Sequence, residues 1–275
     1  MEQTQAIKEN SITTGVIWKQ LLIFFFPILI GTFFQQLYNT VDTIVVGQYV
    51  GTQALAAVGT TGTMINLLVG FFVGVSSGAT VIISQFFGAG DAKNVSRAVH
   101  TSMALALVGG LIIMVLGLLT ARPSLVMLGV PEEILGDALT YMNVYYAGII
   151  ACMIYNVGTG VLRAIGDSRM PLYVLIVCCL VNIVLDLLFV VGFHWGVFGV
   201  AIATVLSQVV SAVLILLRLM LTRESYRVEL KKIRFDRSIL KNVIRIGLPA
   251  GMQSVLYSVS NLVVQASINS FGTDA

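Results

Sequence analysis

Long uncharged stretches alternate with short polar segments along almost the whole chain. A membrane-spanning helix needs about 20 predominantly apolar residues, and seven stretches reach that length. We place the predicted spans at residues 20–41, 62–87, 101–121, 138–162, 171–193, 195–217 and 246–270. The alternating segments of roughly ten residues that a membrane β-barrel requires do not occur. The pattern therefore predicts an all-α polytopic membrane protein.

Composition supports this interpretation. Hydrophobic residues make up 57% of the 275 residues and charged residues only 11%, whereas a soluble domain has about 25% charged residues. A soluble enzyme and a disordered tail are thereby excluded. Cys152, Cys178 and Cys179 all lie in apolar stretches and are too few for a disulfide scaffold. The sequence has no HExxH motif and no Cys/His cluster, so we expect no metal site and no cofactor.

Lysine and arginine are distributed unevenly between the two sides of the predicted membrane. The segments on the side of the N-terminus hold fifteen of them, and the opposite loops hold only Arg122. By the positive-inside rule, the N-terminus and the basic linker 218–245 are cytoplasmic, and the protein is expected in a bacterial or archaeal plasma membrane. The linker is expected to contact anionic lipid, and we expect no nucleic-acid partner and no obligate protein partner.

The chain contains a weak internal repeat. Residues 19–39 resemble residues 241–261 at an offset of 222, and residues 50–54 resemble residues 271–275. Because both copies start a span on the same side, the repeat predicts two parallel six-helix halves. A full-length protein would then have about 440 residues, and residue 275 would be a truncation point. The predicted division is 1–217 for an N-lobe, 218–245 for the linker and 246–275 for the first helix of a C-lobe.

Two acidic residues fall within the spans, Asp42 at the end of the first and Asp186 in the middle of the fifth. Charges in hydrocarbon are costly and usually mark a functional cavity. Asn182 lies one turn before Asp186, so both side chains share a helix face, where they can hold a proton or a cation. The alternative for Asp186 is a neutral carboxyl that forms a hydrogen bond between packed helices. The alternative for Asp42 is a residue that only ends a helix near the outer membrane interface.

The first span combines a polar outer half with a proline. Gln35, Gln36, Tyr38 and Asn39 are candidates for lining a cavity, with Gln35, Gln36 and Asn39 in a secondary role. Pro27 removes one backbone hydrogen bond and favours a kink. The kink is either a static bend or a hinge that lets the outer half of the span move.

Two further spans carry polar or small residues. Asn156 in the fourth span is either a hydrogen-bonding contact between helices or a ligand. Gly70, Gly74 and Gly78 recur at every fourth position of the second span. Such a stripe of small residues predicts close helix packing.

Several segments, in order, resemble one transporter family. They are residues 27–59, 84–91 (SQFFGAGD), 161–171 (VLRAIGDSRMP), 182–186 (NIVLD) and 247–254 (GLPAGMQS). Together they are similar to the multidrug and toxic compound extrusion (MATE) transporters over essentially the whole chain. The resemblance implies twelve helices in two bundles around a central cavity, of which this chain holds the first six and the start of the second bundle.

The resemblance also implies a function and a site. It implies secondary active export of organic, often cationic, compounds in exchange for H⁺ or Na⁺. By motif, the ion-coupling residues it implies are Tyr38, Asp42, Asn156, Asn182 and Asp186. The alternatives are a related lipid-linked oligosaccharide flippase and a fragment that does not transport because the second half is missing. An intramembrane aspartyl protease is disfavoured, since its YD and GxGD motifs are absent, and we expect no enzyme.

Overall fold

The computed structural model describes residues 16–270, and no β-strand occurs within this range, which confirms the predicted all-α class. The second copy of the short repeat, residues 271–275, lies outside the described residues, as do residues 1–15. The long helices are α1 (Ile17–Val45), α2 (Thr52–Gly88), α3 (Ala92–Met127), α4 (Glu132–Ala147), α5 (Ile149–Ala164), α6 (Arg169–Asp186), α7 (Gly196–Leu221) and α8 (Arg237–Ser270). Three short segments join them: η1 (Val46–Val50) and η2 (Leu187–Gly192), both π-helical, and the 3₁₀ turn η3 (Leu230–Lys232).

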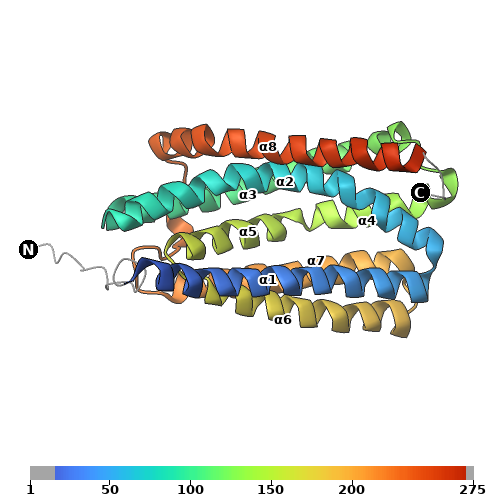
Figure 1. Ribbon diagram of the computed structural model, residues 1–275, viewed down its shortest axis with the longest axis horizontal. Helices are drawn as coiled ribbons and strands as arrows, with labels where there is room; N and C mark the ends of the chain where they lie inside the picture. Colours follow the sequence, from blue (N-terminus) through green and yellow to red (C-terminus); the bar gives the residue numbers. More distant parts are fainter. Residues whose placement is uncertain (1–15, 271–275) are drawn as a thin grey trace, which may run out of the picture.

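The helices run side by side along the long axis of the molecule (Figure 1). Helices α2, α3 and α8 form one side, and α1, α6 and α7 form the other. The pair α4–α5 lies between the two sides, because α5 contacts both α3 and α7. Its large fully buried side chains include Tyr146, Met142 and Met153, which place the packed core there.

Within residues 16–270, five helices are long and apolar enough to cross a membrane, and α4 with α5 forms a sixth candidate that is bent by 52°. The span predicted over 138–162 thus remains a candidate span, but it is a bent pair of helices. The break lies at Gly148, where an added Cβ would lie 2.3 Å from Cγ1 of Val205 on α7. The absence of a side chain at Gly148 lets α7 pack directly against the bend.

The loop expected before residue 62 is not observed, because the second span begins earlier than predicted. Helix α1 continues into η1, and α2 begins at Thr52. Gly51 makes the turn between them with φ = 120°, a conformation that favours glycine. The helix-forming sequence after it, which includes Leu55, Ala56 and Ala57, explains why α2 starts so early.

The seventh predicted span, 246–270, lies within α8. Among the described residues, α8 does not meet the length and apolarity criterion that the other spans meet. Polar residues such as Gln253, Ser254 and Ser258 lower its apolar content. That α8 crosses the membrane stays a prediction.

The glycine stripe of α2 packs closely against α8, as predicted. A Cβ at Gly74 would lie 2.5 Å from Cα of Gly251, and a Cβ at Gly78 would lie 2.3 Å from the carbonyl oxygen of Val243. Gly70 faces Ser254. These distances leave no room for a side chain, so the two helix backbones are in direct contact.

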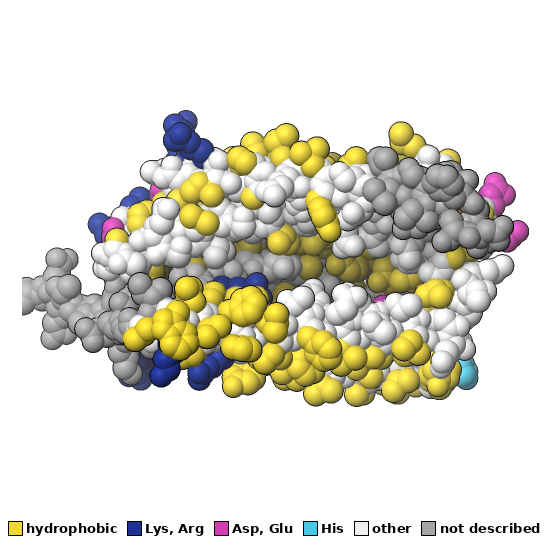
Figure 2. Space-filling model, viewed as in Figure 1, with side chains coloured by type: hydrophobic (Ala, Val, Ile, Leu, Met, Phe, Trp, Pro, Cys, Tyr) yellow, Lys and Arg dark blue, Asp and Glu magenta, His cyan; other side chains and the backbone are white. Residues whose placement is uncertain are grey.

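Charged and apolar side chains occupy different parts of the surface. Figure 2 shows lysine and arginine gathered mainly toward the end where the chain begins, with hydrophobic side chains along the flanks. The segment that joins α7 to α8 lies at the same end (Figure 1). This distribution is typical of a protein whose flanks contact lipid.

Candidate functional site

Asp42 and Asp186 occupy equivalent places on two neighbouring helices. Asp42 lies in the last turn of α1, and Asp186 is the last residue of α6. Helix α1 packs along α6, and the π-helical segments that follow them, η1 and η2, contact each other. As a result the two carboxyl groups are immediate neighbours. Single π-helical turns inside longer helices occur frequently at functional sites.

The polar groups around this pair are deeply buried. Asp186 and Asn182 are both 0% exposed. Both carboxylate oxygens of Asp186, both polar atoms of the Asn182 side chain and Oδ1 of Asp42 have no hydrogen-bond partner in the described part of the chain. A buried carboxylate without a partner is strongly unfavourable. The arrangement therefore suits a proton shared between the carboxyls or a small cation held by their oxygens.

A cavity of about 600 Å³ lies beside the pair. Of the residues predicted from the sequence, its lining includes Gln35, Tyr38, Asn39, Asp42 and Asn156. Figure 2 shows the molecule hollowed between α1 on one side and α2 with α8 on the other. Asp42 thus connects the cavity to the buried carboxyl of its neighbour.

Four of the predicted residues do not line this cavity. Asn182 and Asp186 lie behind it, in the packed interior between α6 and its neighbours. Gln36 is exposed on the outer face of α1. Pro27 lies half-buried within α1, which continues as one helix across it.

Asn156 takes part in both of the roles considered for it. Its side-chain Nδ2 donates to the carbonyl oxygen of Cys152 at 2.8 Å, one turn earlier in α5. The same residue lines the cavity. Its amide nitrogen is thus occupied by its own helix, while the residue remains part of the polar wall.

Sequence reasoning missed one polar wall of the cavity. Thr204, Gln208 and Ser211 of α7 line it together with Tyr141 and Tyr145 of α4. Gln208 Nε2 donates to the hydroxyl of Tyr145 at 3.4 Å, which joins the two helices. The signal was available, because positions 204, 208 and 211 follow helical spacing within an otherwise apolar stretch.

Comparison with known proteins connects this geometry to a family. The probable multidrug resistance protein YoeA of Bacillus subtilis is 27% identical over 94% of this chain and 58% of its own length. A structure described as the outward-facing conformation of a multidrug resistance MATE family transporter has a TM-score of 0.86 and 29% identity, over 94% of this chain and 57% of that chain. For a structure described as the inward-facing conformation, the TM-score is 0.75 and the identity 31%, over 82% of this chain and 51% of that chain.

The chain therefore spans a little more than half the length of these relatives. A family model described as MatE matches residues 27–188, a range that includes both Asp42 and Asp186. Because this match extends over more than half of the sequence, the chain belongs to the MatE family, the multidrug and toxic compound extrusion transporters.

Proposed function

We propose that the chain holds the cation-coupling site of an antiporter that exports organic, often cationic, compounds in exchange for H⁺ or Na⁺. The observation that carries this proposal is the half-buried Asp42 beside the fully buried Asp186 and Asn182. Oδ1 of Asp42 and all side-chain polar atoms of Asp186 and Asn182 have no hydrogen-bond partner in the described residues. The neighbouring polar cavity of about 600 Å³ provides space for the exported compound. Tyr38 and Asn156 complete the proposed site from the cavity side.

The coupling follows from electrostatics. With the pair charged, the cavity favours an organic cation, which contacts Asp42 directly. A proton or sodium ion that neutralises the pair removes this attraction and releases the organic cation. The two cations therefore lower each other's affinity, and this coupling is reciprocal. In this mechanism α1 bends at Pro27, so that the polar wall formed by Gln35, Tyr38 and Asn39 moves with the change of charge.

The proposal includes a location and an orientation. Relatives in bacteria support a multi-pass protein of the inner membrane, and the uneven distribution of lysine and arginine supports a cytoplasmic N-terminus. We retain the division into an N-lobe over 1–217, a linker over 218–245 and the start of a C-lobe at 246. Helix α7 ends at Leu221 and α8 begins at Arg237, so the helices extend into both ends of that linker.

The flippase alternative requires a different cavity. A pyrophosphate-linked substrate needs cationic side chains, and the cavity of the described chain has no lysine or arginine in its lining. The alternative of a fragment that does not transport concerns the part of the relatives' length that this chain does not span. It is distinguished by measuring ion binding, which needs only residues of this chain, separately from export.

The test uses Asp186→Asn with Asp137→Asn as the matched control, since Asp137 is an exposed carboxyl on α4. In detergent, binding of radioactive sodium and the infrared carboxyl band that reports proton uptake are measured on the same samples. We expect Asp186→Asn to abolish ion binding and Asp137→Asn to leave it unchanged. Export of a fluorescent organic cation from liposomes under a pH or a sodium gradient then identifies the driving ion.

Equal ion binding by the wild type and Asp186→Asn would refute the coupling site. Ion binding that depends on Asp186, without export from liposomes, would support the coupling site. It would also indicate that the chain by itself is a fragment that does not transport.

A further inference from the structure

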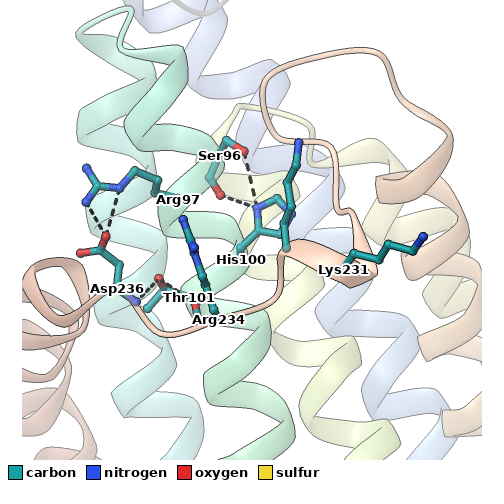
Figure 3. A pocket seen from close by; sticks show the side chains of 8 residues that line it. Ser96, Arg97, His100, Thr101, Lys231, Arg234 and Asp236 are labelled. Carbon is teal, nitrogen blue, oxygen red and sulfur yellow. Dashed lines mark hydrogen bonds and ion pairs between the residues drawn. The ribbon is translucent and has the colours of Figure 1, made fainter.

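A second pocket, separate from the central cavity, lies where α3 meets the segment that joins α7 to α8. Its volume is about 250 Å³. Helix α3 and the joining segment each contribute four lining residues: Ser96, Arg97, His100 and Thr101 from α3, and Lys231, Lys232, Arg234 and Asp236 from the joining segment (Figure 3). Four cationic side chains thus face one carboxylate.

Hydrogen bonds from α3 fix the backbone of the joining segment. His100 is 4% exposed, and its Nε2 accepts the backbone N–H of Glu229 at 3.0 Å. Its Nδ1 must then carry the proton and donate to the carbonyl oxygen of Ser96 at 2.6 Å. Thr101 Oγ1 accepts the backbone N–H of Asp236 at 3.1 Å. His100 and Thr101 therefore serve as anchors, and the pocket walls are held in place.

The cationic side chains divide into two groups. Arg97 pairs with Asp236 and also donates to Asn94. Lys232 pairs with Glu229 at 2.8 Å. Within residues 16–270, Lys231 and Arg234 have no ion pair and no side-chain hydrogen bond.

Figure 3 shows the Arg234 side chain between Arg97 and His100, whereas the Lys231 side chain extends away from these three residues. The unpaired charge of Arg234 thus lies beside Arg97, and that of Lys231 lies at the edge of the pocket.

We propose that this pocket binds a phosphate group, and that the group belongs to an anionic phospholipid. A planar guanidinium matches the oxygens of a phosphate and forms charge-assisted hydrogen bonds with them. The pocket lies at the end of the molecule where α7 ends and α8 begins. Because α7 is long and apolar enough to span a membrane, we expect lipid headgroups to lie at this end. A phosphate bound by Arg234 beside Arg97 would tie the joining segment to α3. This inference does not depend on the proposed antiport.

The test compares two double variants that remove the same charge. Lys231→Gln with Arg234→Gln removes the two unpaired cations of the pocket. Lys241→Gln with Arg245→Gln is the control, because both residues are exposed on the nearby first turns of α8 and do not line the pocket. Each protein is placed in nanodiscs of phosphatidylcholine with increasing phosphatidylglycerol. The thermal unfolding midpoint and the retained phosphatidylglycerol, measured by native mass spectrometry, are followed.

We expect phosphatidylglycerol to stabilise the wild type and the control equally, and to bind the pocket variant about tenfold more weakly. In pure phosphatidylcholine all three proteins should unfold at the same midpoint, which shows that the pocket variant is folded. If that variant unfolds earlier there, Arg234→Lys, which keeps the charge but loses the planar guanidinium, should bind phosphatidylglycerol more weakly than the wild type while unfolding at the same midpoint in pure phosphatidylcholine. Equal loss in both double variants would mean general surface attraction and would overturn the proposal, and so would no loss in either.

A further arm identifies the source of the phosphate. Inorganic phosphate is added at fixed ionic strength, with chloride as the comparison anion. We expect inorganic phosphate not to raise the unfolding midpoint when its concentration equals the effective concentration of lipid phosphate. Stabilisation that matches the lipid and disappears in the pocket variant would overturn the lipid assignment in favour of a soluble phosphate.

Discussion

The substitution Gly148→Ala tests the bend between α4 and α5. The new Cβ would lie 2.3 Å from Cγ1, 2.7 Å from Cγ2 and 3.0 Å from Cβ of Val205, whereas carbon atoms in contact prefer about 3.5–4.0 Å. Val205 cannot rotate away, because it is β-branched and both of its γ carbons are too close. Either α4–α5 or α7 must therefore shift by roughly 1 Å.

Such overpacking costs about 1–3 kcal/mol. For a chain of this size each kcal/mol lowers the unfolding midpoint by about 2–4 °C, so we expect a decrease of about 2–12 °C. The assay heats the protein with a fluorogenic maleimide, which reacts with the buried free thiols of Cys152 and Cys179 when the fold opens. Cys152 lies in α5, directly after the bend.

Gly136→Ala is the matched control on α4, since nothing lies within 4 Å of a Cβ there. It should raise the midpoint slightly, because alanine favours a helix over glycine by up to about 1 kcal/mol. Adding Val205→Ala to Gly148→Ala should recover more than half of the loss, and the double-mutant cycle measures the contact. A midpoint for Gly148→Ala at or above that of Gly136→Ala would refute the reasoning.

Three other outcomes are expected. The backbone N–H of Ile239 and the Arg97 guanidinium lower the pKa of Asp236 from its usual 3.8. The difference in unfolding midpoint between the wild type and Asp236→Asn should therefore be full above about pH 4 and vanish at lower pH. A difference that grows as the pH falls would contradict this sign. Pro27→Ala restores a backbone hydrogen-bond donor within α1. The distance distribution that pulsed EPR measures between spin-labelled amino acids at the exposed positions Leu21 and Leu37 should therefore narrow. An unchanged distribution would argue against a hinge. Gly247→Ala places a Cβ 2.1 Å from the carbonyl oxygen of Val75, so spin labels on α2 and α8 should move apart, while the same labels in Gly59→Ala should not.

The parts of the fold that the sequence predicts are those set by local composition. Long apolar stretches predict helices because the bilayer requires them, and two acids in such stretches predict a site because burial without a partner is costly. Asn182 and Asp186 could be paired in advance, since their spacing places them on one face. That Asp42 would be the immediate neighbour of Asp186 came only from the family resemblance, and the packing of α1 along α6 now provides its structural basis.

The errors come from contacts between distant segments. The bend at Gly148 packs against Val205 of α7, a contact that the local sequence does not reveal. The π-helical segments η1 and η2, which extend α1 and α6, likewise contact each other across a long separation in the sequence. The polar wall of α7 was missed for a different reason. Thr204, Gln208 and Ser211 follow helical spacing within an apolar stretch, so local sequence could have predicted this wall.

The glycine stripe of α2 also has a consequence for how the protein is assembled in the cell. Stripes of small residues can join two copies of the same helix in a membrane, and α2 enters the bilayer long before α8 has been synthesised. During that interval Gly70, Gly74 and Gly78 form an exposed helix-packing surface, against which α2 of another nascent molecule can pack. The arrival of Gly247 and Gly251 closes that surface from within the same molecule. In the folded chain α8 thus occupies the surface through which two copies of α2 would otherwise pair.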